Sequence, residues 1–229
     1  MTDHINISYG AKRNRKVIAN IKEDIARARK IFGKRLEISM GIELGEGHHD
    51  LYMARELADD DEIDFVIGSL HQPRKCLDYY EVNYDRADMN ALFRLYYDEM
   101  MEMAAAGCYD VIAHFNLPLR YLSTAARERT DLSPFLGRMR EILREVARAG
   151  KGIEINTSGL RQDGGITLPS VEVAKIFREE GGVIVTTGSD AHRLERVGHA
   201  LERGIKCLAS AGFDKFAFYK KRIPHFHKI

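Results

Sequence analysis

The stretch "IVTTGSDAH", residues 184–192, ends a run of β-branched residues with an acid and a histidine two positions apart. Such a run is typical of a buried β-strand. Alternate residues of a strand face the same side, so we expect Asp190 and His192 to point together. They would then lie at the mouth of whatever this strand helps to build.

The same alternation of strand and helix signals runs along the whole chain and predicts an α/β fold. Apolar periodicity predicts helices at 15–32, 50–59, 88–107, 133–150, 168–181 and 194–212, and strands at 36–44, 64–71, 109–115, 151–158, 182–189 and 215–222. Alternation with short links indicates parallel strands joined by helical crossovers. With no linker-like segment to divide the chain, we expect one domain over residues 1–229. Periodicity leaves a barrel and an open sheet as alternatives.

Composition excludes several classes of protein. The chain has 229 residues, 45% of them hydrophobic, and a net charge of +1, which gives no argument for a nucleic acid or a membrane as partner. No apolar run approaches the roughly 20 residues that span a bilayer. Three widely spaced cysteines without a CxxC pair predict reduced thiols and a cytoplasmic protein.

Polar residues with metal-ligand chemistry end several of the expected strands. In parallel α/β folds the carboxyl ends of the strands meet on one face, where ligands bind. Imidazole mixed with carboxylate suits zinc, iron or manganese. Singly, each residue has an ordinary interpretation, such as Asp190 capping the next helix. As a set they predict a metal site made of His4, Glu43, His71, His114, Asp190 and His192.

Two further histidine pairs are given ordinary roles. Adjacent side chains point apart in an extended chain, so His48 and His49 in "GEGHHD" are interpreted as exposed loop residues, with metal coordination or contact with substrate as the alternative. His225 and His227 in "PHFH", close to the last residue, are interpreted as part of a polar tail.

Taken in order, the motifs resemble those of a known family. They are "TDH" (2–4), "GIELG" (41–45), "IGSLH" (67–71), "IAHFNL" (112–117), "EINTSGLR" (154–161) and "TGSDAH" (187–192). The set resembles the PHP family of metal-dependent phosphoesterases, and most of all its histidinol-phosphate phosphatase branch. The resemblance implies a distorted (β/α)7 TIM-like barrel with up to three divalent transition-metal ions at its C-terminal face.

The resemblance also implies a role for each residue. Glu43 would bridge ions, with His71 and His114 beside it on one of them. Asp190 would bind a second ion, and His4 and His192 a third. The catalytic centre would then contain Glu43, Asp190 and His192, while Arg120 and Arg161 would hold the phosphate of the substrate by forked hydrogen bonds.

The chain departs from the family at its beginning. Family members start with a strand that carries His-x-His, whereas "TDH" begins here at residue 2. We therefore expect the barrel to lack its first strand and most of its second, and the site to hold fewer ions.

The function implied is hydrolysis of L-histidinol phosphate to L-histidinol and phosphate in histidine biosynthesis. The expected partner is thus a small phosphorylated metabolite, and a homo-oligomer is compatible with the sequence. Two alternatives stay open: a PHP phosphoesterase with another substrate, and a truncated or degenerate metal-binding domain without catalysis.

Overall fold

The computed structural model describes residues 1–162 and 165–229, and in them helices and strands alternate as expected. The strands of the main sheet are β1 (His4–Asn6), β2 (Gly41–Gly45), β3 (Phe65–Ser69), β4 (Val111–Ile112), β5 (Gly152–Asn156) and β6 (Val185–Gly188). The helices are α1 (Ala11–Phe32), α2 (Leu51–Ala58), α3 (Met89–Ala106), α4 (Thr124–Glu128), α5 (Leu136–Arg148), α6 (Val171–Glu179) and α7 (Leu201–Ser210).

The six strands form one parallel sheet in the order of the sequence, β1 to β6. His4 on the first strand and His192 beyond the last strand have ring Nε2 atoms only 3.2 Å apart. The sheet must therefore be strongly curved. Curvature of this degree brings the carboxyl ends of all the strands around a common point. The prediction of a parallel α/β fold is therefore confirmed.

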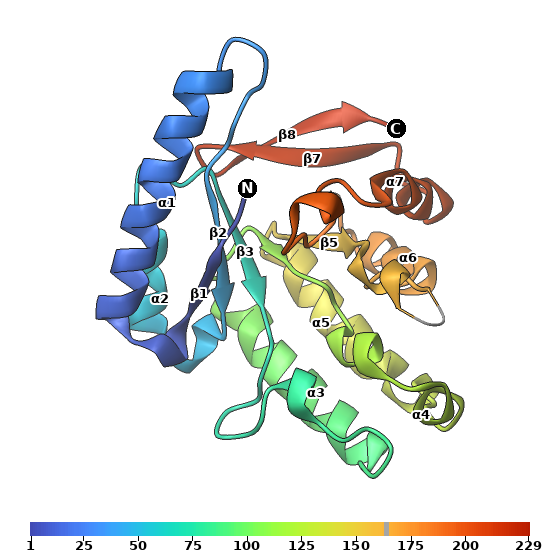
Figure 1. Cartoon of the computed structure of the whole chain (residues 1–229). Coiled ribbons are helices and arrows are strands. Elements are labelled where there is room, and N and C mark those ends of the chain that lie inside the picture. Colours follow the sequence, from blue (N-terminus) through green and yellow to red (C-terminus); the bar gives the residue numbers. More distant parts are fainter. Residues whose placement is uncertain (163–164) are drawn as a thin grey trace.

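Helices cover the outer face of this curved sheet (Figure 1). The residues between the two layers are almost all aliphatic or aromatic, including Ile42 and Leu44 of β2 and Phe93 and Tyr97 of α3. In α5 the buried side chains are Met139, Ile142, Leu143 and Val146, which recur every three or four residues as an amphipathic helix requires. The outer layer thus follows directly from the helical periodicity of the sequence.

A separate hairpin covers the inner face. Strands β7 (Lys215–Lys220) and β8 (Ile223–Lys228) pair antiparallel, and the hairpin crosses the molecule at the end where the N-terminus lies (Figure 1). Its Ala217 and Tyr219 pack on a small apolar cluster of the sheet that includes Ile67 and Val111. The rings of Tyr219 and Phe65 lie 4.9 Å apart.

The interpretation of residues 224–227 as a polar tail was right about the exposure of both histidines and wrong in that these residues form a strand. They belong to β8, and the rings of His225 and His227 stack on Phe218 of β7 at 5.4 and 4.7 Å. Alternate residues of a strand share a face, so a histidine at every second position places both rings on one aromatic neighbour.

Several further segments differ from expectation, and the strand expected at 109–115 comprises only Val111–Ile112. The helix expected at 194–212 is a 3-10 turn at Leu194–Arg196 followed by α7, because Gly198 and Ala200 have φ of 71° and 57°, which a helix cannot contain. The strand expected at 36–44 begins only at Gly41. Among the described residues, the helices are each too short or too polar to cross a membrane.

The turn of the hairpin anchors it to the amino ends of the strands. Lys221 and Arg222 have φ of 50° and 63°, the left-handed pair that a two-residue hairpin turn requires. The guanidinium of Arg222 donates from Nε and Nη2 to the two oxygens of Asp110, at 2.6 and 2.9 Å. The Asp64 carboxylate accepts from Lys221 N at 3.0 Å. Asp64 and Asp110 directly precede β3 and β4, so the hairpin closes the end of the sheet opposite the candidate site.

Candidate metal centre

Glu43, on β2, is the residue around which the candidate site is built. Its Oε1 atom lies 3.2 Å from His71 Nε2 and 3.4 Å from His114 Nε2, and its Oε2 atom lies 3.7 Å from His4 Nδ1. The parallel register pairs His4 directly with Glu43. One largely buried carboxylate therefore has three imidazoles around it, one from β1 and the others from the segments that follow β3 and β4.

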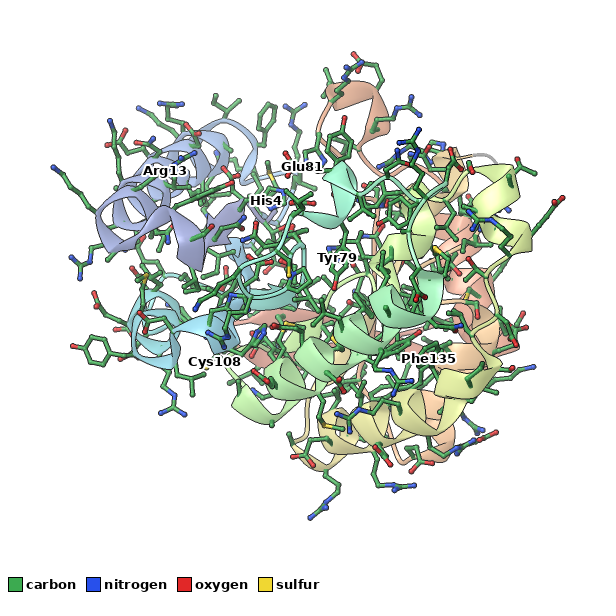
Figure 2. The ribbon with its side chains drawn as sticks, turned by 90° about the horizontal axis from the view of Figure 1, so that it is seen from below. His4, Arg13, Tyr79, Glu81, Cys108 and Phe135 are labelled. Carbon is green, nitrogen blue, oxygen red and sulfur yellow. The ribbon has the colours of Figure 1, made fainter. Side chains whose placement is uncertain are left out.

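The second half of the site continues from His4. His192 Nε2 lies 3.2 Å from His4 Nε2, and His192 Nδ1 lies 3.3 Å from Asp190 Oδ1. The other Asp190 oxygen accepts from Arg120. In Figure 2, which views the molecule from this end, His4 projects between α1 and the segment that carries Tyr79 and Glu81. The structure thus brings together all six residues that the sequence singled out.

The backbone is strained at several of these positions. His114 and Asp190 have φ of 27° and 48°, and the neighbouring Glu46 has φ of 54°. Positive φ angles cost a residue that has a side chain roughly 1 kcal/mol or more. Asp190 also lies beyond the end of β6, so the strand alternation first used to pair it with His192 does not hold. The two side chains meet because the chain turns sharply there.

The donor set fits a divalent transition-metal ion. One ligand atom from each of His4, Glu43 and His71 lies within 4.8 Å of the others. Atoms bound about 2.0–2.2 Å from one ion stand about 3.3–3.6 Å apart in tetrahedral geometry, close to the separations found around Glu43. Imidazole and carboxylate ligands together favour zinc, iron or manganese over magnesium or calcium.

Comparison with known proteins places the chain in a family. The model of the PHP domain matches residues 1–158. The chain belongs to the PHP domain family.

Two relatives that it resembles are named as a histidinol-phosphatase or a probable one. A probable histidinol-phosphatase of Clostridium acetobutylicum is 26% identical over 97% of this chain and 85% of its own length. The histidinol-phosphatase of Lactococcus lactis is 27% identical over 86% of this chain and 73% of its own.

A solved structure shows the same fold. The histidinol phosphate phosphatase of Lactococcus lactis, crystallised with zinc, L-histidinol and phosphate, superposes with a TM-score of 0.78 at 20% identity, covering 91% of this chain and 79% of that one.

Electrostatics in this PHP domain favour an ionised carboxylate at the centre. Burial alone would raise the pKa of the Glu43 carboxyl, but hydrogen bonds from His114 and His71 hold it well below its usual value. Burial would likewise lower the pKa of His71, yet the hydrogen bond and charge of Glu43 raise it to about 9. For His114 burial prevails and its pKa is lowered. Without an ion, the centre therefore holds Glu43 as an anion and His71 as a cation.

Two acids of the site were missed from the sequence. Glu154, on β5, is buried, accepts from His114 N at 3.1 Å and Asn156 Nδ2 at 3.0 Å, and its pKa is raised to about 7 by burial. Glu46 accepts from His71 N at 2.7 Å. The signal for Glu154 was an acid between two isoleucines in a strand. A Cβ at Gly188 would lie 2.1 Å from its Oε1 atom, so only glycine leaves room for it.

The two arginines predicted to bind phosphate both contact the Asp190 segment. Arg120 donates to the Asp190 carboxylate and to Ser158 Oγ. Arg161 donates to the backbone carbonyls of Ser189 and Asp190 at 2.7 and 3.0 Å. Both guanidinium groups therefore border the candidate site, and both have protein partners that a phosphate would have to share or displace.

Metal affinity should depend steeply on pH, because an ion must displace the proton that His71 carries. With the pKa of His71 at about 9, affinity should rise about tenfold per pH unit between pH 7 and 8 and level off above pH 9. Calorimetric titration of chelator-treated protein with Zn²⁺, in buffers of different ionisation enthalpy, should show about one proton released per ion at pH 7. Affinity independent of pH would contradict the Glu43–His71 pairing.

Proposed function

We propose that this chain is a divalent-metal-dependent phosphomonoester hydrolase whose substrate is L-histidinol phosphate. The observation that carries the proposal is the convergence of His4, His71 and His114 on Glu43 in the parallel sheet of a PHP domain. The shared name of the relatives, and the L-histidinol and phosphate of the Lactococcus lactis structure, support the choice of substrate.

We assign the ions to the rim, which is the group formed by His4, Glu43, His71, His114, Asp190 and His192, and propose what these residues do there. Divalent ions bound there lower the pKa of water and neutralise phosphoryl oxygens. Glu43, as an anion, would hold them together with His71 and His114 on one side, and Asp190 with His4 and His192 would hold them on the other. Arg120 keeps Asp190 ionised, since its charge outweighs the effect of burial and lowers the pKa of that carboxyl. Arg120 and Arg161 orient the phosphate from the Asp190 side.

We propose in addition that the fold is a PHP-type (β/α)7 barrel without its first strand and most of its second, and that residues 1–229 are one domain. In support, a cavity of about 340 Å³ lies between the sheet and the hairpin, lined among others by Thr2, Gly41, Thr186 and Phe218. A barrel open at this point would hold fewer than three ions. Contact with a second copy of the chain would protect the open edges, so a homo-oligomer fits the same proposal.

A role in histidine biosynthesis is consistent with a cytoplasmic enzyme. The three cysteines are free in the structure, as that compartment requires.

Phosphate release across a panel of esters tests the substrate. With Zn²⁺, Mn²⁺ or Fe²⁺ supplied in turn, L-histidinol phosphate should exceed p-nitrophenyl phosphate and glycerol phosphate in kcat/KM by at least about a hundredfold. That ratio corresponds to about 2.7 kcal/mol of transition-state discrimination. Equal rates across the panel would assign the chain to another PHP phosphoesterase activity.

The remaining alternative is a metal-binding domain without catalysis. This alternative would be favoured if the protein, with Glu43 intact and at least one ion bound per chain, showed no turnover. Measuring metal content beside turnover separates it from a catalyst that merely lost its ions in purification.

A further inference from the structure

A second group of metal-type side chains lies outside the rim. His48 and His49, in the 3-10 turn Gly47–His49 after β2, both direct Nε2 at one oxygen of Glu99 on α3, at 2.6 and 2.9 Å. One ligand atom from each of the three lies within 4.8 Å of the others. The interpretation of His48 and His49 as exposed loop residues was therefore wrong, because the turn, unlike an extended chain, directs both rings the same way.

We propose that His48, His49 and Glu99 form a second metal site, which takes a divalent transition ion such as Zn²⁺. Two imidazoles and a carboxylate are one of the ligand sets zinc uses in proteins, with a further position left for water. The His49 side chain is 15% exposed, so one side of the group is open to water, whereas His48 at 2% is enclosed.

The separations allow an ion with little movement. Ligand atoms about 2.1 Å from one ion would stand about 3.4 Å apart in tetrahedral geometry, so the Glu99 oxygen would have to withdraw by about 0.5 Å from His49 and about 0.8 Å from His48. The rings of His48 and His49 lie 4.3 Å apart in an edge-to-face arrangement, which already separates their nitrogen atoms.

The surroundings hold the three side chains in place. The second oxygen of Glu99 accepts from Arg74 N at 2.9 Å, the kind of outer hydrogen bond that orients a ligating carboxylate. The Arg74 guanidinium donates to the carbonyls of His49 and His48 at 3.3 and 3.4 Å and so fixes the turn. The Nδ1 atom of His48 is buried without a partner, which should make this site weaker than the rim.

Charge also favours a cation. The pKa of His48 is lowered by burial, in opposition to its hydrogen bond with Glu99. The pKa of Glu99 is itself lowered, since hydrogen bonds from His48 and Arg74 N outweigh its burial. The group therefore offers the Glu99 carboxylate beside two imidazoles, with Glu102 one turn further along the same helix. An ion would join the segment after β2 to α3, and Arg74 would link the segment after β3 to them.

The test uses a background in which the rim is disabled, E43Q/H71Q/D190N, and Co²⁺ as a spectroscopic probe. Equilibrium dialysis and visible absorption should show one tightly held Co²⁺ per chain in this background. Adding H49Q should weaken its binding by at least roughly a hundredfold and remove the absorption. Adding D98N, at an exposed acid on the same helix that pairs with Arg138, should leave both unchanged. Zn²⁺ should raise the melting temperature of the background but not of the H49Q protein.

Two outcomes would overturn the site: a folded background that binds no Co²⁺, or equal Co²⁺ binding with and without H49Q. If H49Q fails to fold by circular dichroism, E99Q takes its place with the same expectations. Because the rim is disabled throughout, failure here leaves the phosphatase proposal untouched, and failure of the phosphatase proposal leaves this result standing.

Discussion

Glu43→Gln is expected to lower the turnover of L-histidinol phosphate by at least about a thousandfold while the protein stays folded. The amide keeps the shape of the side chain but removes the charge toward which His4, His71 and His114 point. A neutral amide is a poor bridging ligand, so ion content should fall together with turnover. Steady-state kinetics and metal analysis on the same preparation measure both.

The matched control is Glu62→Gln, the same substitution at an exposed acid that pairs with Lys22. Its turnover should equal that of the unmodified protein. If turnover of the Glu43 variant stayed within a few fold of normal and its ion content were unchanged, Glu43 would not be a ligand of the metal centre.

Arg222→Met is expected to lower the free energy of unfolding by about 2–4 kcal/mol. Removing one partner of a buried ion pair leaves the other charge without compensation, at a cost of about 3–5 kcal/mol. The Asp110 side chain is 7% exposed and the Arg222 side chain 31%, so solvent should reduce that cost somewhat. Urea unfolding followed by circular dichroism measures the change.

Lys220→Met is the control on the same hairpin, because Lys220 pairs with Glu37 in solvent, at 42% and 68% side-chain exposure. We expect a change of at most about 0.5 kcal/mol. A double-mutant cycle with Asp110→Asn should show strong coupling to Arg222→Met. Equal effects of the two hairpin substitutions would indicate that the Asp110 contact adds little.

The parallel sheet and the rim could be predicted from the sequence because both depend on local patterns. Apolar periodicity located α1, α3 and α5, and the rule that strand ends share a face brought Glu43, His71 and His114 together before any coordinates. These features need no knowledge of which segments meet across the fold.

What could not be predicted depends on long-range contacts or on a sharp local turn. β8 is a strand because β7 pairs with it and Phe218 receives its histidines, and "PHFH" alone contains no sign of that partner. His48 and His49 converge on Glu99 through a 3-10 turn that extended-chain reasoning excludes. Gly198 and Ala200 end a helical pattern by backbone angles that the apolar spacing does not reveal.

The closeness of His4 and His192 has a consequence for the order of assembly. The two rings touch across 188 positions of the chain, one on the first strand of the sheet and the other past the last. Closing so long a loop costs entropy that only late contacts repay, so this junction should be among the last parts of the protein to form. Metal binding would then occur only after folding is complete. A substitution that destabilises any one strand of the sheet should therefore delay metal binding.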